Sequence, residues 1–204
     1  MTQLQNTDCA KKIRACSQTP DLDGCPCKAI VTAPVPGEGP LDAQVVIIGR
    51  NPGADEDKQN RPFVGRSGQL LNTFLNALGL DRSQCAILNL VKCFTPKNRE
   101  PFEMELTNCR PLIQEEMRLL PNKRIFFLLG DTVVQACFKK SPGRISDIEG
   151  HVYYDKKHGI YVIPLTHPSY WARRKEQRQK IFKRVVPKLF KPLQDFLLRS
   201  SIHK

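Results

Sequence analysis

The chain has 204 residues, of which 40% are hydrophobic and 25% are charged, a balance that excludes an intrinsically disordered protein. Its net charge of +12 favours a polyanionic partner such as nucleic acid, although charge alone does not separate DNA from RNA or another anionic surface. No stretch approaches the roughly 20 apolar residues of a membrane-spanning helix, and the N-terminus lacks an apolar signal core, so we expect a cytoplasmic protein without membrane contact.

Hydrophobic periodicity divides the chain into alternating helices and strands. A polar, cysteine-bearing segment with a helix over 5–15 precedes a loop rich in proline and glycine at 31–40. Short apolar runs predict strands, and apolar residues at helical spacing predict helices. The remaining predicted elements are, in order, strand 44–49, loop 51–65, helix 67–78, strand 85–91, loop 94–101, helix 103–120, strand 124–130, helix 131–138, strand 160–165 and a basic helical stretch 173–198 with kinks at Pro187 and Pro192.

This alternation predicts an α/β fold, a three-layer α/β/α sandwich with a central, mostly parallel, four-stranded sheet. The length suits one domain over 1–204, with a cysteine-bearing N-terminal segment 1–40 and a basic C-terminal helical region 173–204. In parallel sheets, active clefts lie beyond the carboxyl ends of the strands. The loops that begin at Gly49, Asn89 and His167 follow three such ends, so we expect them to converge on one cleft.

The first of these loops, 49–53, reads Gly-Arg-Asn-Pro-Gly and places an amide side chain at the edge of the sheet. The proline and glycine fix a tight turn with exposed backbone N–H groups, and Asn51 is suited to hold a water molecule. Phe63 follows between turn residues and can lie flat against a planar ligand. The same residues also fit a plain strand-to-loop turn with a core phenylalanine, so this loop does not define a site by itself.

A series of short motifs carries a resemblance that covers most of the chain, from about residue 13 to about residue 173. The motifs are PGEGP at 36–40, GRNPG at 49–53, RPFVGRSGQLL at 61–71, NLVKC at 89–93, NREP at 98–101, LLG at 128–130 and THPS at 166–169. In this combination and order the chain resembles the iron–sulfur uracil-DNA glycosylases, and it looks most like the family-four branch of that superfamily.

The resemblance implies a monofunctional DNA glycosylase of base excision repair, which flips uracil out of the stack and hydrolyses its N-glycosidic bond. Asn51 would position water, Phe63 would stack on the base, and Asn89 would read the uracil edge. His167 would stabilise negative charge on uracil O2, an interaction of roughly 3–4 kcal/mol, and Ser169 would press into the DNA. The implied contact residues further include Gly49, Arg50 and Gly53 for the substrate, and Arg173 and Arg174 for phosphates.

One departure from the family pattern concerns positions 50 and 51. The usual family-four motif reads Gly-Glu-Ala-Pro-Gly, whereas Arg50 and Asn51 stand here, and the Gly-x-Asn-Pro-Gly form is similar to the mismatch-specific and single-strand-selective branches. A neutral amide can orient water but is a poor base. A carboxylate among Asp55, Glu56 and Asp57 could assist, or these could be solvated loop charges, and Arg50 could contact phosphate or pair with them.

Three functions therefore stay open. The first is a monomeric, monofunctional glycosylase acting on uracil in DNA, associated with the nucleoid through its substrate. The second is a glycosylase with a wider range, such as deaminated purines or mismatched bases, as the residues at 50 and 51 suggest. The third is a non-catalytic DNA-binding module, which would have no use for Asn51, Phe63, Asn89 and His167 together.

Eight cysteines in a cytosolic chain indicate metal binding rather than disulfides. The resemblance implies a structural [4Fe–4S] cluster with four ligands, Cys16, Cys25, Cys93 and Cys109. Cys16 and Cys25 are further apart than the family pattern has them, which leaves Cys27 as a substitute for either. Four thiolates also suit zinc, and buried free thiols are common, whereas Cys85 and Cys137 fit the core pattern.

Overall fold

The computed structural model describes residues 2–16, 33–138 and 142–202. Its centre is a five-stranded sheet in the order β2-β1-β3-β5-β4, where β1, β2, β3 and β5 are parallel and β4 pairs antiparallel with β5. The predicted α/β class and mostly parallel sheet are confirmed, with one strand more than expected. The strands are β1 (Val45–Gly49), β2 (Cys85–Asn89), β3 (Ile125–Leu129), β4 (Tyr153–Asp155) and β5 (Ile160–Leu165).

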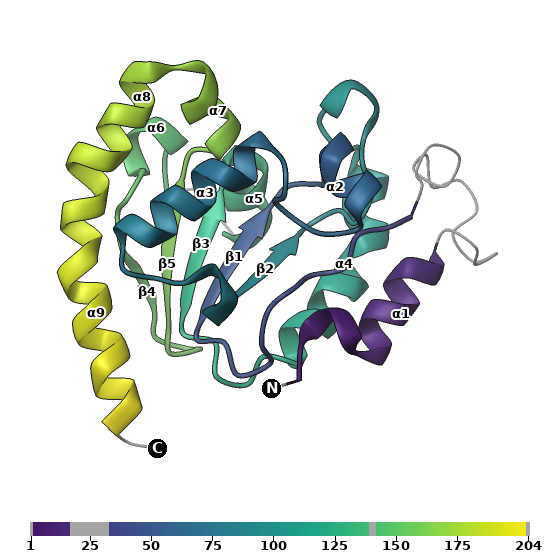
Figure 1. The fold of residues 1–204 in the computed structure, drawn as a ribbon, viewed down its shortest axis with the longest axis horizontal. Helices are drawn as coiled ribbons and strands as arrows, with labels where there is room; N and C mark the ends of the chain where they lie inside the picture. The colour runs from purple at the N-terminus through teal and green to yellow at the C-terminus, as the bar shows by residue number, and fades with distance from the viewer. Residues whose placement is uncertain (1, 17–32, 139–141, 203–204) are drawn as a thin grey trace.

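Helices cover both faces of the sheet, with α3 on one face and α4 and α5 on the other (Figure 1). The N-terminal α1 packs beside α4, and the C-terminal α9 runs along the side of β4 and β5. The helical elements are η1 (Leu4–Asn6), α1 (Asp8–Ala15), α2 (Ala54–Gln59), α3 (Arg66–Ala77), η5 (Arg82–Gln84), η6 (Pro96–Asn98), α4 (Glu103–Arg118), α5 (Asp131–Cys137), α6 (Ile145–Ile148), α7 (Pro168–Arg173), α8 (Lys175–Lys180), η7 (Ile181–Val185) and α9 (Val186–Ile202).

The central strands are buried on both faces, which explains why they read as continuous apolar runs. All residues of β1, β2 and β3 are buried. Ile47 and Phe127 face α3 and the C-terminal helices, whereas Ile48 and Leu128 face α4 and α5. Two cores therefore hold the sheet rigid between them and fix where its strands end.

The additional strand, β4, is short and partly exposed, which is why the hydrophobic pattern did not predict it. Its three residues alternate between half-buried and exposed, and Tyr154 is 53% exposed. It joins β5 through a tight turn in which Gly159 adopts a φ of +66°, a conformation that favours glycine. The hairpin depends on pairing with β5 rather than on burying its own side chains.

Two further differences concern helices. The predicted loop 51–65 contains α2, a helix that begins at Ala54 and ends at Gln59. The predicted stretch 173–198 instead starts with α7 at Pro168, is interrupted by an extended Arg174, and continues through α8 to α9. A π-helical turn, η7, ends just before Pro187, whose missing N–H and bulky ring do not fit regular α-helical bonding. Within the described ranges, no helix is long and apolar enough to cross a membrane.

Candidate active site

A pocket of about 670 Å³ lies at the carboxyl ends of the parallel strands. Its walls come from the loops that follow β1, β2, β3 and β5, so the three loops singled out in the sequence do converge. Of the predicted contact residues, Arg50, Asn51, Gly53, Phe63, Asn89, His167, Ser169 and Arg173 line this pocket. Gly49 ends β1 against it, and Arg174 lies in a neighbouring groove with its guanidinium 5.2 Å from the Tyr170 ring centre.

Asn89 is the last residue of β2 and is only 2% exposed. Its side-chain oxygen, Oδ1, is buried and has no hydrogen-bond partner among the described residues. A buried polar atom without a partner costs free energy, so such atoms are rare in folded proteins and point to a function. At the floor of a pocket, Asn89 is therefore suited to bond a ligand that enters.

Gly49 makes room for Asn89 and Phe63. It is paired with Asn89 in the sheet register, and a Cβ atom on Gly49 would lie 2.5 Å from both Asn89 Oδ1 and Phe63 Cζ. Both distances are far below van der Waals contact. Position 49 therefore requires glycine because two pocket side chains occupy the space beside it.

Replacement of Gly49 by alanine should lower the melting temperature, because overpacking typically costs about 1–3 kcal/mol, and should lower at least about tenfold the rate of the reaction that this pocket catalyses. The control is Gly159→Ala, whose Cβ would meet nothing within 4 Å but whose φ of +66° is strained. Both variants should lose stability, measured by thermal melting, and only Gly49→Ala should lose single-turnover activity. Full activity in Gly49→Ala would contradict this steric account.

Phe63 is held in an uncommon backbone conformation. Its φ is +51°, its ring is buried, and its carbonyl oxygen accepts a hydrogen bond from Arg82 Nη1 at 2.9 Å. A Cβ on Gly68 would collide with that carbonyl, so glycine is also required there. The Phe63 ring lies 5.8 Å from the His167 ring, centre to centre, at an angle of 34°. An aromatic face and an imidazole thus share one end of the pocket.

Glu56 joins the turn after Asn51 to the segment after Phe63. It is 8% exposed, and its carboxylate accepts backbone N–H bonds from Gly53 at 3.0 Å, Val64 at 2.9 Å and Gly65 at 2.8 Å. The expectation of a solvated loop charge is wrong for Glu56. Its oxygens are engaged in shaping the pocket wall, which leaves it poorly placed to act as a base.

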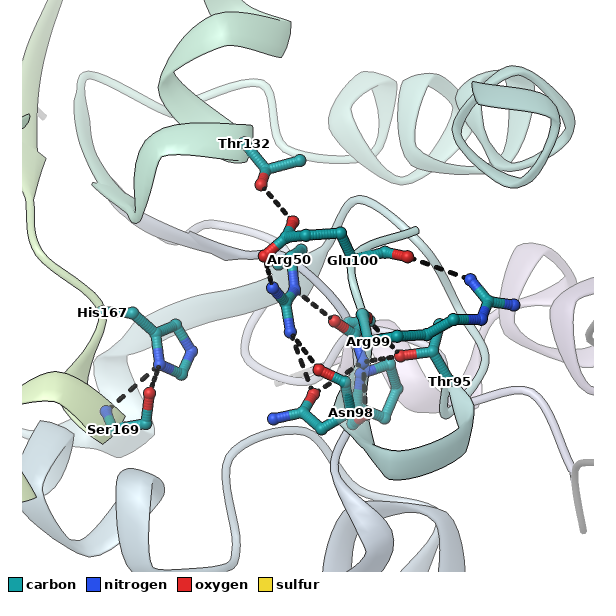
Figure 2. A network of polar contacts seen from close by, with 10 residues as sticks. Arg50, Thr95, Asn98, Arg99, Glu100, Thr132, His167 and Ser169 are labelled. Atoms are coloured by element: carbon teal, nitrogen blue, oxygen red, sulfur yellow. Dashed lines mark hydrogen bonds and ion pairs between the residues drawn. The ribbon is translucent and has the colours of Figure 1, made fainter. Parts of the chain in front are cut away.

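Arg50 pairs with Glu100, and not with the acidic residues of α2 as one prediction had it (Figure 2). Its Nη2 donates to the Asn98 carbonyl at 3.1 Å and to Asn98 Oδ1 at 3.0 Å. Thr132 donates to the other Glu100 oxygen at 2.7 Å. The guanidinium is therefore held beside the pocket by a loop that the sequence did not connect to it.

Asn51 belongs to the same network. Its Oδ1 accepts from Arg50 Nε at 2.6 Å, and its Nδ2 donates to the Pro52 carbonyl at 2.8 Å and to Thr95 Oγ1 at 3.2 Å. An amide oxygen has two lone pairs, so Oδ1 keeps one for a further donor such as water. The side chain is thereby fixed in one orientation at the pocket wall.

His167 caps the N-terminus of α7 with its ring. Nδ1 accepts the backbone N–H of Ser169 at 3.1 Å and lies 2.9 Å from Ser169 Oγ. A nitrogen that accepts a hydrogen bond carries no proton, so the neutral ring bears its proton on Nε2. Burial, and then the positive charges of Arg50 and Arg173, lower the pKa of His167 from 6.5 to about 4. At neutral pH the ring is therefore an uncharged donor.

The low pKa of His167 makes the stability of the fold depend on pH. Between pH 6.5 and pH 4 the unfolded chain binds a proton at this ring that the folded protein does not, so the free energy of unfolding falls as the pH falls. Denaturant unfolding at pH 7 and pH 4 should show a larger loss for the wild type than for His167→Gln. Equal losses would mean that His167 is not buried in its neutral form.

A buried polar network, which the sequence did not reveal, supports the residue before His167. Thr166 donates through its backbone N–H to Glu149 Oε1 at 3.0 Å and through its hydroxyl to the same carboxylate. Trp171 Nε1 donates to Thr166 Oγ1 at 2.7 Å, and Gln177 donates to Glu149 Oε2 at 2.7 Å. The network connects the end of β5 to α7 and α8 and so holds the His167 turn in place.

Two of the predicted metal ligands lie in one small buried cluster. Cys93 follows β2, Cys109 lies on α4, and both are 6% exposed and pack with Val91 and Leu106. Cys109 Sγ lies 3.4 Å from the backbone nitrogen of Lys92, which donates to it. Thiolate sulfurs that receive backbone N–H bonds in an apolar setting suit an iron–sulfur cluster.

The other predicted ligands are on the N-terminal side of the chain. Cys16 is the half-buried C-cap of α1, which packs against α4, the helix that bears Cys109. Cys25 and Cys27 lie outside the described residues. Within 2–16, 33–138 and 142–202 no three potential ligands gather around one point. Of the cysteines expected in the core, Cys85 is buried, whereas Cys137 is exposed and that prediction was wrong.

The pocket and the sheet lie within a recognised family region. The model of the uracil DNA glycosylase superfamily matches residues 36–190. This range contains every residue that lines the pocket. The chain therefore belongs to the uracil-DNA glycosylase superfamily.

Curated relatives assign the branch. The chain is 38% identical over 144 residues to the type-4 uracil-DNA glycosylase of Sulfurisphaera tokodaii, in a match that spans 68% of this chain and 65% of that relative. It is 33% identical over 177 residues to the type-4 enzyme of Thermotoga maritima, across 87% of this chain and 90% of the relative. The type-4 enzyme of Archaeoglobus fulgidus is 31% identical over 187 residues, across 87% of this chain and 90% of the relative. The chain is thus a member of the type-4 branch, as its motifs predict.

Proposed function

We propose that this protein is a monofunctional uracil-DNA glycosylase that hydrolyses the N-glycosidic bond of a flipped-out uracil in base excision repair. The observation that carries the proposal is the side-chain oxygen Oδ1 of Asn89 at the end of β2, which is buried and has no hydrogen-bond partner among the described residues. Uracil presents an N3–H donor beside the O4 acceptor, and one amide matches both. Cytosine presents the reverse pattern on that edge, so the same amide would reject it.

The rest of the pocket supplies what the bond cleavage needs. As the bond breaks, negative charge develops on the base, and His167 Nε2–H is the donor that we assign to uracil O2. The Phe63 ring serves as the stacking face. Asn51, held by Arg50, orients the attacking water through its remaining lone pair, and Ser169 presses into the DNA.

The DNA itself would be held by basic side chains at the end of α7. The net charge of +12 suits a polyanionic substrate, and we assign phosphate contacts to Arg173, which lines the pocket, and to Arg174 beside it. We further propose a monomeric, single-domain protein located in the cytoplasm with the nucleoid. No lysine is assigned as a nucleophile, so strand cleavage is not part of the reaction.

The test compares substrates. Single- and double-stranded oligonucleotides that contain uracil, hypoxanthine or xanthine are incubated with the protein and then treated with alkali, which breaks the strand at abasic sites. Breaks only at uracil are expected. Breaks at the purine lesions would favour the wider range, for which the neutral Asn51 is the supporting observation. Intact strands despite DNA binding would leave a non-catalytic module.

We also propose that Cys16, Cys25, Cys93 and Cys109 hold a structural [4Fe–4S] cluster, with Cys27 as the alternative to Cys16 or Cys25. Support comes from the buried Cys93–Cys109 pair and from the packing of α1 against α4. When bound, the cluster would cross-link the N-terminal segment to α4 and to the loop after β2. It takes no part in bond cleavage, because uracil removal transfers no electrons.

The cluster proposal predicts the iron content of cysteine variants. Cys93→Ser and Cys109→Ser should lose most of their iron and sulfide and the broad visible absorption of the cluster, because four thiolate ligands are needed. Cys137→Ser is the control, since Cys137 is exposed and is not assigned as a ligand. The pair Cys25→Ser and Cys27→Ser separates the two ligand choices. Zinc in place of iron in the purified wild type would contradict the assignment.

A further inference from the structure

Lys92 and Glu116 form an ion pair that does not line the pocket. The side chain of Lys92 is 0% exposed and that of Glu116 is 2% exposed. Besides contacting Glu116 Oε2, Lys92 Nζ donates a hydrogen bond to the backbone carbonyl of Asn89 at 2.8 Å. A buried lysine thus bonds the peptide of the residue that we assign to read the base.

The pair connects three separate parts of the fold. The Lys92 carbonyl accepts the N–H of Val35 at 2.7 Å, and Glu116 Oε1 accepts the N–H of Gly37 at 2.6 Å. The Lys92 N–H contacts Cys109 Sγ on α4, the helix that also bears Glu116. The end of β2, α4 and the segment before β1 therefore meet at one pair of charges.

Burying two charges is costly, and a buried ion pair adds little stability over apolar residues of similar size. Stability alone therefore does not explain the pair. The pair instead fixes an orientation. Glu116 holds Lys92 Nζ in place, and Nζ in turn holds the backbone carbonyl of Asn89, the last residue of β2. A residue that reads a base must be held within about 0.5 Å of its productive position, and hydrogen bonds from neighbouring residues to its backbone provide that precision.

We propose that Lys92 is a positioning residue for base recognition, which orients Asn89 through its backbone carbonyl while Glu116 holds the ammonium group. This inference rests on the proposed reading of uracil by Asn89. Lys92 touches neither base nor sugar, so its effect should appear in the affinity for uracil rather than in the contacts with the DNA backbone.

The experiment separates positioning from stability by removing both charges. In Lys92→Met/Glu116→Gln no unpaired charge stays buried, and the amide oxygen introduced at position 116 can still accept the Gly37 N–H, so the melting temperature should lie near that of the wild type. Inhibition by free uracil should nevertheless weaken about tenfold, the effect of roughly one lost hydrogen bond, with affinity for abasic-site DNA within about twofold. If the double variant matches the wild type in both melting temperature and uracil inhibition, the proposal is overturned.

Glu116→Gln alone provides a second measurement. It loses stability because the charge of Lys92 is left uncompensated. The amide oxygen introduced at position 116 can still accept a hydrogen bond from Lys92 Nζ, so part of the positioning persists, and inhibition by uracil should weaken less than in Lys92→Met/Glu116→Gln. If Glu116→Gln instead weakens uracil inhibition as much as the double variant does, the pair acts as a structural unit and the proposal fails.

Asn89→Ala in the same uracil-inhibition assay distinguishes a failure of the Lys92 proposal from a failure of the proposed function. Unchanged uracil inhibition in Asn89→Ala would remove the reading role of Asn89 itself, and the Lys92 proposal with it. Weakened inhibition in Asn89→Ala together with unchanged inhibition in the double variant would overturn the Lys92 proposal alone.

Discussion

Replacing His167 by alanine should lower the single-turnover rate of uracil excision by about 10²–10³-fold, the usual effect of removing one preorganised donor from a developing oxyanion. The affinity for DNA should change little, because the donor matters most once charge has moved onto the base. The neutral ring is well suited to this role, since its proton is fixed on Nε2 by the Ser169 N–H bond to Nδ1 and its pKa is about 4.

The control for this prediction is Ser169→Ala. It removes the hydroxyl that we assign to pressing into the DNA but keeps the backbone N–H that fixes the tautomer, so the loss should fall on DNA affinity while most of the single-turnover excision rate is retained. Rates come from single-turnover assays, and affinities from titration of DNA that contains an abasic site. If His167→Ala lowers rate and affinity equally, the ring binds substrate and does not stabilise the leaving group selectively.

Replacing Asn89 by alanine should lower kcat/KM for uracil at least about 100-fold, because a flipped uracil would be buried with its edge unpaired. Asn89→Leu keeps the branched shape of the side chain but offers no hydrogen bond. If the loss in Asn89→Ala came from the cavity left behind, leucine would restore activity. We expect both variants to be equally impaired, and recovery in Asn89→Leu would contradict the reading role.

Much of the fold follows from local sequence signals. The strands β1, β2 and β3 are buried on both faces, so each is a short apolar run that can be recognised without any knowledge of its neighbours. The strand β4 and the helix α2 were missed because neither buries a continuous apolar face. β4 depends on its pairing with β5, and α2 on the contacts of Glu56 with distant backbone N–H groups.

The residues of the site likewise divide into those that sequence signals predict and those that they do not. Residues at the carboxyl ends of strands, such as Asn89 and His167, were predicted because the topology of a parallel sheet and the family motifs both point to them. The residues that hold them in place were not predicted. Glu100, Glu149 and Lys92 act through partners that are distant in sequence or through a backbone carbonyl, and no spacing rule identifies such contacts.

The capping of α7 by His167 affects how the protein binds the phosphates of its substrate. Helix N-termini often hold phosphate with their free N–H groups. Here Pro168 has none, the Ser169 N–H is taken by the imidazole, and the Tyr170 N–H bonds the His167 carbonyl. Phosphate beside this turn would have to be bound by flexible arginine side chains, so retention of DNA would weaken steeply with added salt, while the leaving-group donor stays rigid.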